Sequence, residues 1–375
     1  MKSGVLCFAA VLAAAPLFAH HELRAEFDEQ KPVSLRGTVT RLDWNNPHAL
    51  LFVDVTAKGE TVNWAVEWAS PLDLRGAGWT RDSLKVGDSV TVEGWLARDG
   101  SNLASGRSVV LASGKHLSEP PETEAARARG PAKPTPRWPD GHPRLGVVPG
   151  EKGYWANPTA ASLVETTAGN IRMDKDGLLA NLKDADKVAP FQPWAKGLYE
   201  YHQQTLLKDD PMLACLPPGG PRIFQVAHGV QFLEQPERKR LFVMSGGGNR
   251  NWRLIYLDGR ALPQSDDVSP TYFGYSSGHW DGDTLVVESS AFLERFWFSN
   301  GGLPHSESLH LTEKFSRPDF NTLRYEVTVN DPGTYTRPWS SVWTLGWVAD
   351  QDIQEYFCQD DSSDESHMVG PKTLR

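Results

Sequence analysis

Apolar and polar residues alternate along residues 31–116 with the period of two that is typical of β-strands with one buried face. Ser70-Pro71 then predicts a short helix that ends near Leu84. The expected strands centre on Val33 to Val39, Leu51 to Val55, Val62 to Trp68, Val90 to Val92 and Ser108 to Leu111. Three strands, a helix and two strands follow the order of the OB-fold, so we predict an OB-like five-stranded barrel.

The same alternation returns between residues 217 and 360, where turns are short. The expected strands are Ile223–Glu234, Arg240–Ser245, Arg253–Leu257, a central hairpin within 274–296, Glu307–Phe315, Thr322–Val329, Val342–Val348 and Ile353–Cys358. About eight antiparallel strands favour a closed, calycin- or lipocalin-like β-barrel, because closure removes exposed edges. Barrels of that size can hold one small ligand. The predicted fold class is therefore mainly β, with two barrels.

The central hairpin is predicted from Asp281-Gly282, a dipeptide typical of two-residue β-turns. A turn centred there places His279 opposite Thr284. One face of the hairpin then carries a tyrosine, a serine, a histidine and a glutamate, and the other face is small and apolar. Such a face can line a ligand pocket, and it can equally be the wet face of an ordinary antiparallel sheet.

Between the two barrels the composition changes. Residues 117–150 are rich in proline, which favours an extended linker. Residues 151–216 have helical character, and Pro193 to Leu207 is the best helix candidate. The predicted organisation is a signal peptide at 1–19, an OB-like barrel at 20–116, a linker at 117–150, a short helical lead-in at 151–216, an antiparallel β-barrel at 217–360 and an acidic mobile tail at 361–375.

The first residues read as a secretory leader. Lys2 supplies the positive charge, Val5 to Phe18 is an apolar stretch too short to span a bilayer, and Ala19 suits the peptidase. We therefore expect cleavage after Ala19 and a location in the periplasm or outside the cell. The sequence contains no run of about 18 apolar residues, so no transmembrane helix is predicted. The net charge of −9, without a basic cluster, argues against nucleic acid as a partner.

Cys215 and Cys358 are the cysteines that remain once this leader is removed. In an oxidising compartment two cysteines favour a disulfide. The alternative is a pair of buried free thiols.

Two sets of motifs resemble known families. Ala19-His20-His21 and Asn46-Pro47-His48-Ala49 resemble an exported bacterial family that is catalogued only as a domain of unknown function. Gly278-His279-Trp280-Asp281-Gly282-Asp283-Thr284-Leu285-Val286-Val287, His305-Ser306-Glu307 and Arg317-Pro318-Asp319 resemble a second uncharacterised bacterial family. The resemblances imply compartment and architecture and bring no reaction.

The mature N-terminus is a candidate metal site. If cleavage precedes His20, the α-amine and ring of this residue can bind one metal ion, and a further histidine nitrogen completes a site that suits copper. His48, at the turn between the first two strands, and His21 are the candidates for that third ligand. The alternative is a frayed polar terminus, with His48 capping a turn.

The C-terminal barrel supplies the other candidates, which are Tyr256, Tyr275, His279, Glu288, His310, Glu313, Arg324, Glu326 and Glu355. His279 and Glu288 could act in general acid–base catalysis. His310 and Glu313 are three apart on a strand, so they face opposite sides and form no dyad. The sequence contains no nucleophile elbow and no histidine pair on a helix, which leaves catalysis as an alternative.

Aromatic residues gather on the same hairpins, namely Trp280, Phe292, Phe296, Trp297, Phe298, Trp339, Trp343 and Trp347. Aromatic walls can grip an apolar ligand, and they can also simply be core. We predict an exported protein whose C-terminal barrel binds a small, partly apolar ligand through Tyr256, Tyr275, Trp280, Arg324, Glu326 and Trp343. The alternatives are a periplasmic hydrolase or isomerase and an interaction module of an envelope complex.

Overall fold

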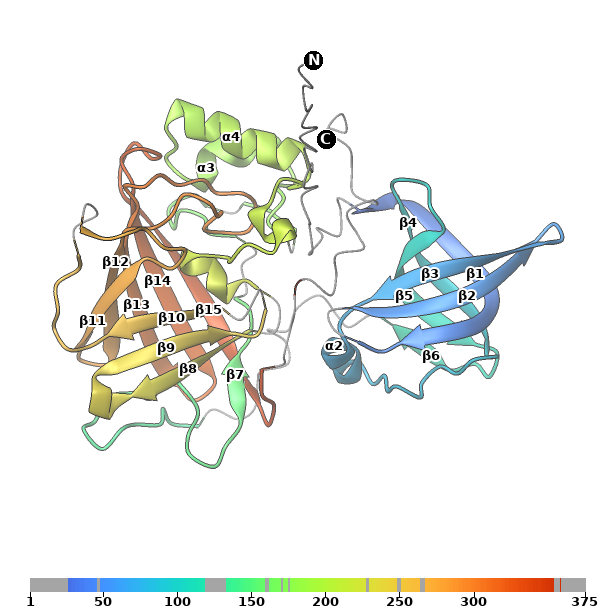
Figure 1. The fold of residues 1–375 in the computed structure, drawn as a ribbon, viewed down its shortest axis with the longest axis horizontal. Helices are drawn as coiled ribbons and strands as arrows, with labels where there is room; N and C mark the ends of the chain where they lie inside the picture. The colour runs from blue at the N-terminus through green and yellow to red at the C-terminus, as the bar shows by residue number, and fades with distance from the viewer. Residues whose placement is uncertain are drawn as a thin grey trace, which may run out of the picture.

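The computed structural model describes residues 26–45, 48–118, 133–158, 162–169, 171–174, 176–226, 229–247, 251–263, 267–353 and 358. Figure 1 shows two separate β-structures, the N-terminal one in blue to teal and the C-terminal one in green to red. The mainly β fold with two barrels and a short helical lead-in is therefore confirmed.

The N-terminal structure has the strand order of an OB-fold. Its elements are β1 (Phe27–Asp43), β2 (Ala49–Ala57), β3 (Glu60–Trp68), α2 (Pro71–Gly76), β4 (Ser89–Ala97), β5 (Leu103–Leu111) and β6 (His116–Ser118). The sheet order is β3-β2-β1-β4-β5-β6, and a parallel pairing of β3 with β5 joins the two ends of the five-stranded part. The long strand β1 pairs with both β2 and β4, and irregularities at Asp28/Pro32 and Val39/Arg41 let it bend between them.

The predicted helix from Ser70 to Leu84 is much shorter in the structure. It covers Pro71–Gly76 only, because Gly78 adopts a φ of +88° that a right-handed helix cannot continue through. The chain then places Trp79 against Trp68, with ring centroids 4.7 Å apart. Gly106 lies directly under Trp68, where a Cβ would come within 2.5 Å of the indole, so the core at this point admits only glycine.

The C-terminal structure is a closed barrel of nine strands in the order β10-β11-β12-β13-β14-β15-β7-β8-β9. The strands are β7 (Gly153–Trp155), β8 (Val230–Gln235), β9 (Arg240–Ser245), β10 (Trp252–Tyr256), β11 (Tyr275–Asp281), β12 (Thr284–Ser290), β13 (His310–Asp319), β14 (Thr322–Asn330) and β15 (Trp339–Ala349). Strand β7 lies within the predicted helical lead-in and pairs Trp155 with both Trp347 and Val230. The predicted strand Ile353–Cys358 falls largely outside the described residues.

One pair of neighbouring strands is parallel, which is an exception in a barrel that is otherwise antiparallel as expected. Ile255 of β10 pairs with Ser276 of β11 in the parallel sense. Asp258-Gly259, a dipeptide typical of tight turns, follows β10 but does not join β10 and β11 as a hairpin. Parallel neighbours need a crossover connection rather than a tight turn.

The central hairpin forms, but its turn lies one residue further along than predicted. Asp281 pairs with Thr284, so the two-residue loop is Gly282-Asp283, and His279 faces Val286 rather than Thr284. Gly282, the first loop residue, has a φ of +56°, as a type II′ turn requires at that position. The register between the two strands differs from the prediction by two residues, an even number, so each side chain keeps its predicted face.

One end of the barrel is closed by residues 133–150, which the sequence suggested as linker. The guanidinium of Arg137 donates two hydrogen bonds to Asp283, of 2.7 and 2.6 Å. Trp138 Nε1 donates to Glu234 Oε1 over 3.0 Å, and the Gly146 amide donates to the other oxygen over 2.8 Å. This closing segment therefore ties the central hairpin to strand β8.

Arg317 connects the closing segment to the barrel at the same end. Its guanidinium lies 4.8 Å from the ring of Trp155 and 5.0 Å from that of Trp347. It donates to the carbonyl oxygens of Arg144 and Phe320, both over 2.7 Å. Burial lowers the pKa of Arg317 to about 10. The Arg317-Pro318-Asp319 motif therefore has a structural role.

The other end of the barrel is capped by helices and loops. The cap contains η2 (Leu182–Asp184), α3 (Ala185–Val188), α4 (Pro193–Gln204), η3 (Pro211–Ala214) and η4 (Gly220–Phe224), and η5 (Pro236–Arg238) lies in the β8–β9 turn. Figure 1 shows α4 above the barrel. Helix α4 agrees with its prediction and ends at Gln204, since Leu206 and Leu207 have positive φ angles. None of the described helices has the length and apolar character needed to cross a bilayer.

The segment around Ile223 was expected to start a strand, but it forms the 3₁₀ helix η4. Pro221 is compatible with the start of a helix and cannot donate to a sheet. The helix inserts Phe224 into the barrel, where its ring centroid lies 4.9 Å from Tyr325 and 5.8 Å from Phe315. Aromatic rings therefore occupy the middle of the barrel.

Candidate functional site

The predicted catalytic pair lies on the outer surface of the barrel. His279 is exposed on β11, and it faces Val286 across the hairpin. Glu288 is half-buried and pairs with His310, whose Nε2 lies 3.4 Å from Glu288 Oε2. Thr312 Oγ1 also donates to this carboxylate over 3.0 Å. The hairpin face named from the sequence therefore faces outward.

The predicted ligand-binding residues are scattered. The side chains of Arg324 and Glu326 form an ion pair of 2.9 Å on the outer face. Tyr275 donates to the Ser269 carbonyl over 3.3 Å, beneath the crossover. Tyr256 lies under the guanidinium of Arg260, at 3.5 Å from its ring centroid.

Two tryptophans of the predicted ligand-binding set pack against other side chains of the protein. Trp280 stacks on His142 of the closing segment, with ring centroids 5.0 Å apart. Trp343 points into the core, 5.6 Å from Tyr325. Glu355 lies outside the described residues. The structure therefore does not bring the predicted ligand-binding set together.

A buried polar network that the sequence did not reveal crosses the barrel interior. Arg253 donates to Glu313 Oε1 over 2.8 Å and to the second carboxylate oxygen as well. Ser276 and Ser289 accept from the same guanidinium at 3.1 and 2.7 Å. Tyr325 donates to Glu313 over 2.9 Å. Each partner is satisfied, so this network is a structural element of the core rather than an open site.

Simple periodicity could have found this pair. Arg253 shares its strand face with buried Ile255, and Glu313 shares its face with Leu311 and Phe315. His310 lies on the opposite face of β13, so the prediction that it forms no dyad with Glu313 is confirmed. A charged residue on an apolar face predicts a buried partner.

Aromatic residues gather at the capped end, where α4 and two long loops meet. We call this group the cap cluster; it consists of Phe191, Tyr199, Phe298, His305, Tyr335 and Trp339. Tyr335 is central, with ring centroids 5.6 Å from Phe191, 5.3 Å from Trp339 and 6.3 Å from Phe298.

The remaining members of the cap cluster are also connected by ring contacts. Phe191 stacks on Tyr199 at 5.1 Å, and Phe298 lies 6.0 Å from His305. All members except Phe191 are almost fully buried. The sequence named Phe298 and Trp339 as aromatic walls and did not predict Tyr199 or Tyr335.

Four buried polar atoms at the cap cluster have no hydrogen-bond partner among the residues that the structure describes. They are the Tyr199 hydroxyl, Trp339 Nε1, His305 Nε2 and Thr334 Oγ1. By contrast, the Tyr335 hydroxyl donates to the Pro304 carbonyl over 2.8 Å. A buried polar group without a partner costs about 1–3 kcal/mol. Groups of this kind in a native core therefore point to an occupant that would satisfy them.

The cap cluster contains a buried histidine, His305, and lies beside a buried aspartate, Asp331. Burial lowers the pKa of His305, against the opposing effects of the Ser306 and Phe296 carbonyls and the Asp331 and Glu294 carboxylates. Its Nδ1 lies 3.2 Å from the Ser306 carbonyl oxygen. The Asp331 carboxylate is itself buried and accepts from the Ser306 amide over 2.7 Å and from the Ser306 hydroxyl.

The tyrosines of the cap cluster keep their hydroxyl protons. Burial raises the pKa of Tyr199 and of Tyr335 well above its ordinary value. Both hydroxyls are therefore donors throughout the physiological range. The cap cluster therefore combines buried apolar rings with neutral hydrogen-bond donors.

The remaining predicted aromatics are core. Phe296 packs 4.3 Å from His305, and Phe292 lies 6.3 Å from Phe296. Trp297 packs 4.2 Å from His202 in a smaller cluster under α4.

The predicted copper ligands are only partly covered by the structure. His20 and His21 lie outside the described residues. His48 follows the first strand, and its Nδ1 lies 3.1 Å from the buried carboxylate of Glu67. Within the described ranges, no group of three or more His, Cys, Asp and Glu side chains is arranged to hold a metal ion.

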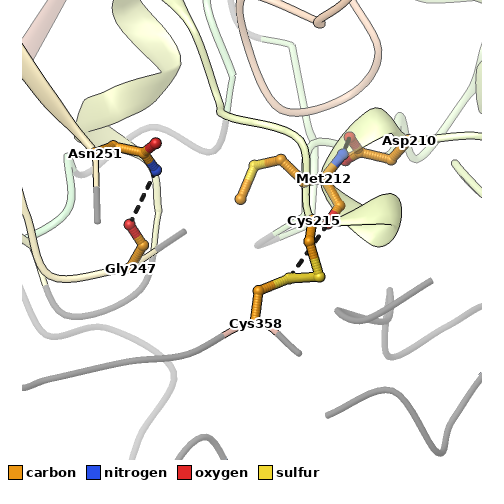
Figure 2. The surroundings of a disulfide bond; sticks show 6 residues. All are labelled: Asp210, Met212, Cys215, Gly247, Asn251 and Cys358. Atoms are coloured by element: carbon orange, nitrogen blue, oxygen red, sulfur yellow. Dashed lines mark hydrogen bonds between the residues drawn. A yellow bond between two sulfur atoms is a disulfide. The ribbon is translucent and has the colours of Figure 1, made fainter. Parts of the chain in front are cut away.

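Cys215 and Cys358 lie at bonding distance, with Cα atoms 5.6 Å apart, in agreement with the predicted disulfide. Figure 2 shows the bridge below Met212, with Gly247 and Asn251 to the left in this view. The bond links the connection between η3 and η4 to the chain beyond β15.

Comparison with known proteins covers the N-terminal part only. Residues 9–106 match a family of unknown function (DUF6152). This range includes most of the OB-like barrel and agrees with the resemblance of the N-terminal motifs to an uncharacterised family. No curated protein and no solved structure matches the chain. The C-terminal family resemblance stays a prediction.

Proposed function

We propose that this chain is an exported protein that binds a small, partly apolar ligand at the cap cluster of its C-terminal barrel. The observation that carries the proposal is the group of four buried polar atoms that have no partner among the described residues, three of them on connected aromatic rings. Ligand sites in proteins are mostly apolar pockets with a few placed polar groups.

The energetics favour an occupant. Four unmade hydrogen bonds would cost about 4–12 kcal/mol if each costs 1–3 kcal/mol. That sum is comparable to the whole stability of a typical domain. A bound molecule or buried water that accepts from Trp339 and Tyr199 removes part of this cost.

Export is supported by two independent features. A leader of the kind predicted at residues 1–19 would direct secretion, and a Cys215–Cys358 bridge is typical of proteins in an oxidising compartment.

The test is native mass spectrometry of the protein isolated from its own cell envelope, compared with the denatured chain. We expect a small-molecule adduct on the folded wild type that is reduced in Trp339→Phe and Tyr199→Phe variants. Trp252→Phe is the matched control, because Trp252 is 56% exposed on β10, away from the cap cluster. A folded wild type that carries no small molecule would refute the proposal and favour the interaction-module alternative.

A second candidate function is copper binding by the mature N-terminus, through His20 with His48 or His21. The observation that favours it is the contact between His48 Nδ1 and Glu67, because a carboxylate commonly orients a metal-binding histidine through its other ring nitrogen. We expect copper titration of protein with a verified His20 terminus to give a tight site that His20→Ala abolishes. Equal affinity in the two proteins would discard this candidate.

A further inference from the structure

The unpartnered groups at the cap cluster include two donors. The indole Nε1–H of Trp339 can only donate a hydrogen bond. The Tyr199 hydroxyl also stays protonated, since burial raises its pKa. The partner that both groups lack is therefore an acceptor, such as a carbonyl, ether or hydroxyl oxygen.

The two donors belong to one connected chain of rings. Trp339 contacts Tyr335 directly, and Tyr199 reaches Tyr335 through Phe191. Thr334, which precedes Tyr335, adds a hydroxyl that can donate or accept. A ligand that accepts hydrogen bonds from these groups would contact aromatic surfaces, which favour flat or cyclic molecules.

The charges around the cap cluster disfavour an anion. Asp331 is buried, and its negative charge would repel a second carboxylate. His305 gives no compensating positive charge because burial keeps its ring neutral. Arg337, on the same loop, is already bound to Glu165 over 2.6 and 3.0 Å.

A cation fits the donors poorly. Aromatic rings and a nearby carboxylate can attract an ammonium group. An ammonium group, however, has only donors and cannot satisfy Trp339 Nε1–H or the Tyr199 hydroxyl. Both kinds of charged ligand would therefore leave the buried donors without partners.

We infer that the ligand of the cap cluster is an uncharged cyclic compound with an oxygen acceptor, read by Trp339 and Tyr199. This inference rests on the proposed function and adds the chemical class of the ligand.

Three probes that share one phenyl ring test it, namely acetophenone as the neutral acceptor, benzoate as the anion and benzylammonium as the cation. Binding is followed by the indole ¹H–¹⁵N resonance of Trp339 in the full chain, assigned by its loss in Trp339→Phe. We expect acetophenone to shift this resonance and the charged probes not to shift it. Tyr199→Phe should weaken acetophenone binding about three- to tenfold, the effect of one hydrogen bond. The Trp252→Phe variant should bind as the wild type does.

The outcomes separate the two proposals. Tighter binding of benzoate or benzylammonium, or unchanged acetophenone binding in Tyr199→Phe, would overturn the inferred ligand class and leave ligand binding intact. If no probe binds and the native protein carries no small molecule, buried water fills the cap cluster and both proposals fall. Thermal unfolding of each variant shows whether a loss of binding reflects lost folding.

Discussion

Arg253 and Glu313 face each other inside the C-terminal barrel, where the guanidinium donates to both carboxylate oxygens. Both side chains are almost fully buried, so neither charge has access to water. Strands β10 and β13 are not neighbours in the sheet, and the pair therefore connects opposite walls of the barrel. Its role in stability can be measured directly.

We expect Glu313→Gln and Arg253→Met each to lower the free energy of unfolding by about 3–5 kcal/mol, because each leaves a buried charge without its partner. The exposed pair Arg324–Glu326 is the control, and Arg324→Met should cost less than about 1 kcal/mol. Chemical denaturation measures both. Similar costs at the two pairs would contradict this view of the barrel core.

Removal of the Cys215–Cys358 bridge should destabilise the C-terminal barrel. The two cysteines are 143 residues apart, and the chain-entropy model then gives about 5 kcal/mol for the bridge. We expect a Cys215→Ser/Cys358→Ser variant to unfold at lower denaturant and to be insensitive to added reductant. Wild-type protein whose stability does not change on reduction would argue that the thiols are free.

Acid should destabilise the cap. The folded-state pKa of His305 is lowered by burial, so the unfolded chain binds the proton more readily. The associated stability is present above the ordinary histidine pKa of about 6.5 and is lost as the pH falls towards the folded value, by at most about 1.4 kcal/mol per pH unit. His202 has a lowered pKa for the same reason and adds to the effect.

A His305→Gln variant should therefore show a flatter dependence of unfolding free energy on pH between about 7 and 5. Denaturant titrations at several pH values measure it. His279→Gln, at an exposed position, is the control and should keep the wild-type slope. Identical slopes in all three proteins would show that His305 is not desolvated.

Two glycines should respond in opposite directions to replacement by alanine. A Cβ at Gly153 would lie 2.1 Å from the Trp347 ring, so Gly153→Ala should force β7 away from β15 and destabilise the barrel. Gly197 lies within α4 with no atom near its missing Cβ, so Gly197→Ala should stabilise by about 0.5–1 kcal/mol. Thermal unfolding distinguishes them, and a stabilising Gly153→Ala would show that β7 does not pack as described.

The sequence predicted those features that depend on local periodicity. Alternation of apolar and polar residues along β14 and β15 predicted both strands and which side chains point into the core. Each strand buries every second side chain over about ten residues. The three-residue strand β7 is too short to show a period. The parallel pairing of β10 with β11 depends on a crossover, which no turn motif specifies.

The candidate site was harder to predict for a related reason. Tyr199 comes from α4, His305 from a loop after β12, and Trp339 from the start of β15. These residues meet only in the folded barrel, so no local spacing connects them. The polar hairpin face around His279 was easy to identify in the sequence. It lies on the outside of the barrel because the opposite face, with Leu285 and Val287, is buried in the core.

The seam formed by Trp155 and Trp347 has a consequence for how the molecule can be made. β7 comes first and β15 comes last among the strands of the barrel, and each supplies the edge that the other must cover. A ribosome therefore has to finish almost the whole C-terminal half before the sheet can be sealed. A fragment cut at residue 217 would leave β8 and β15 with bare edges, and such edges recruit other chains.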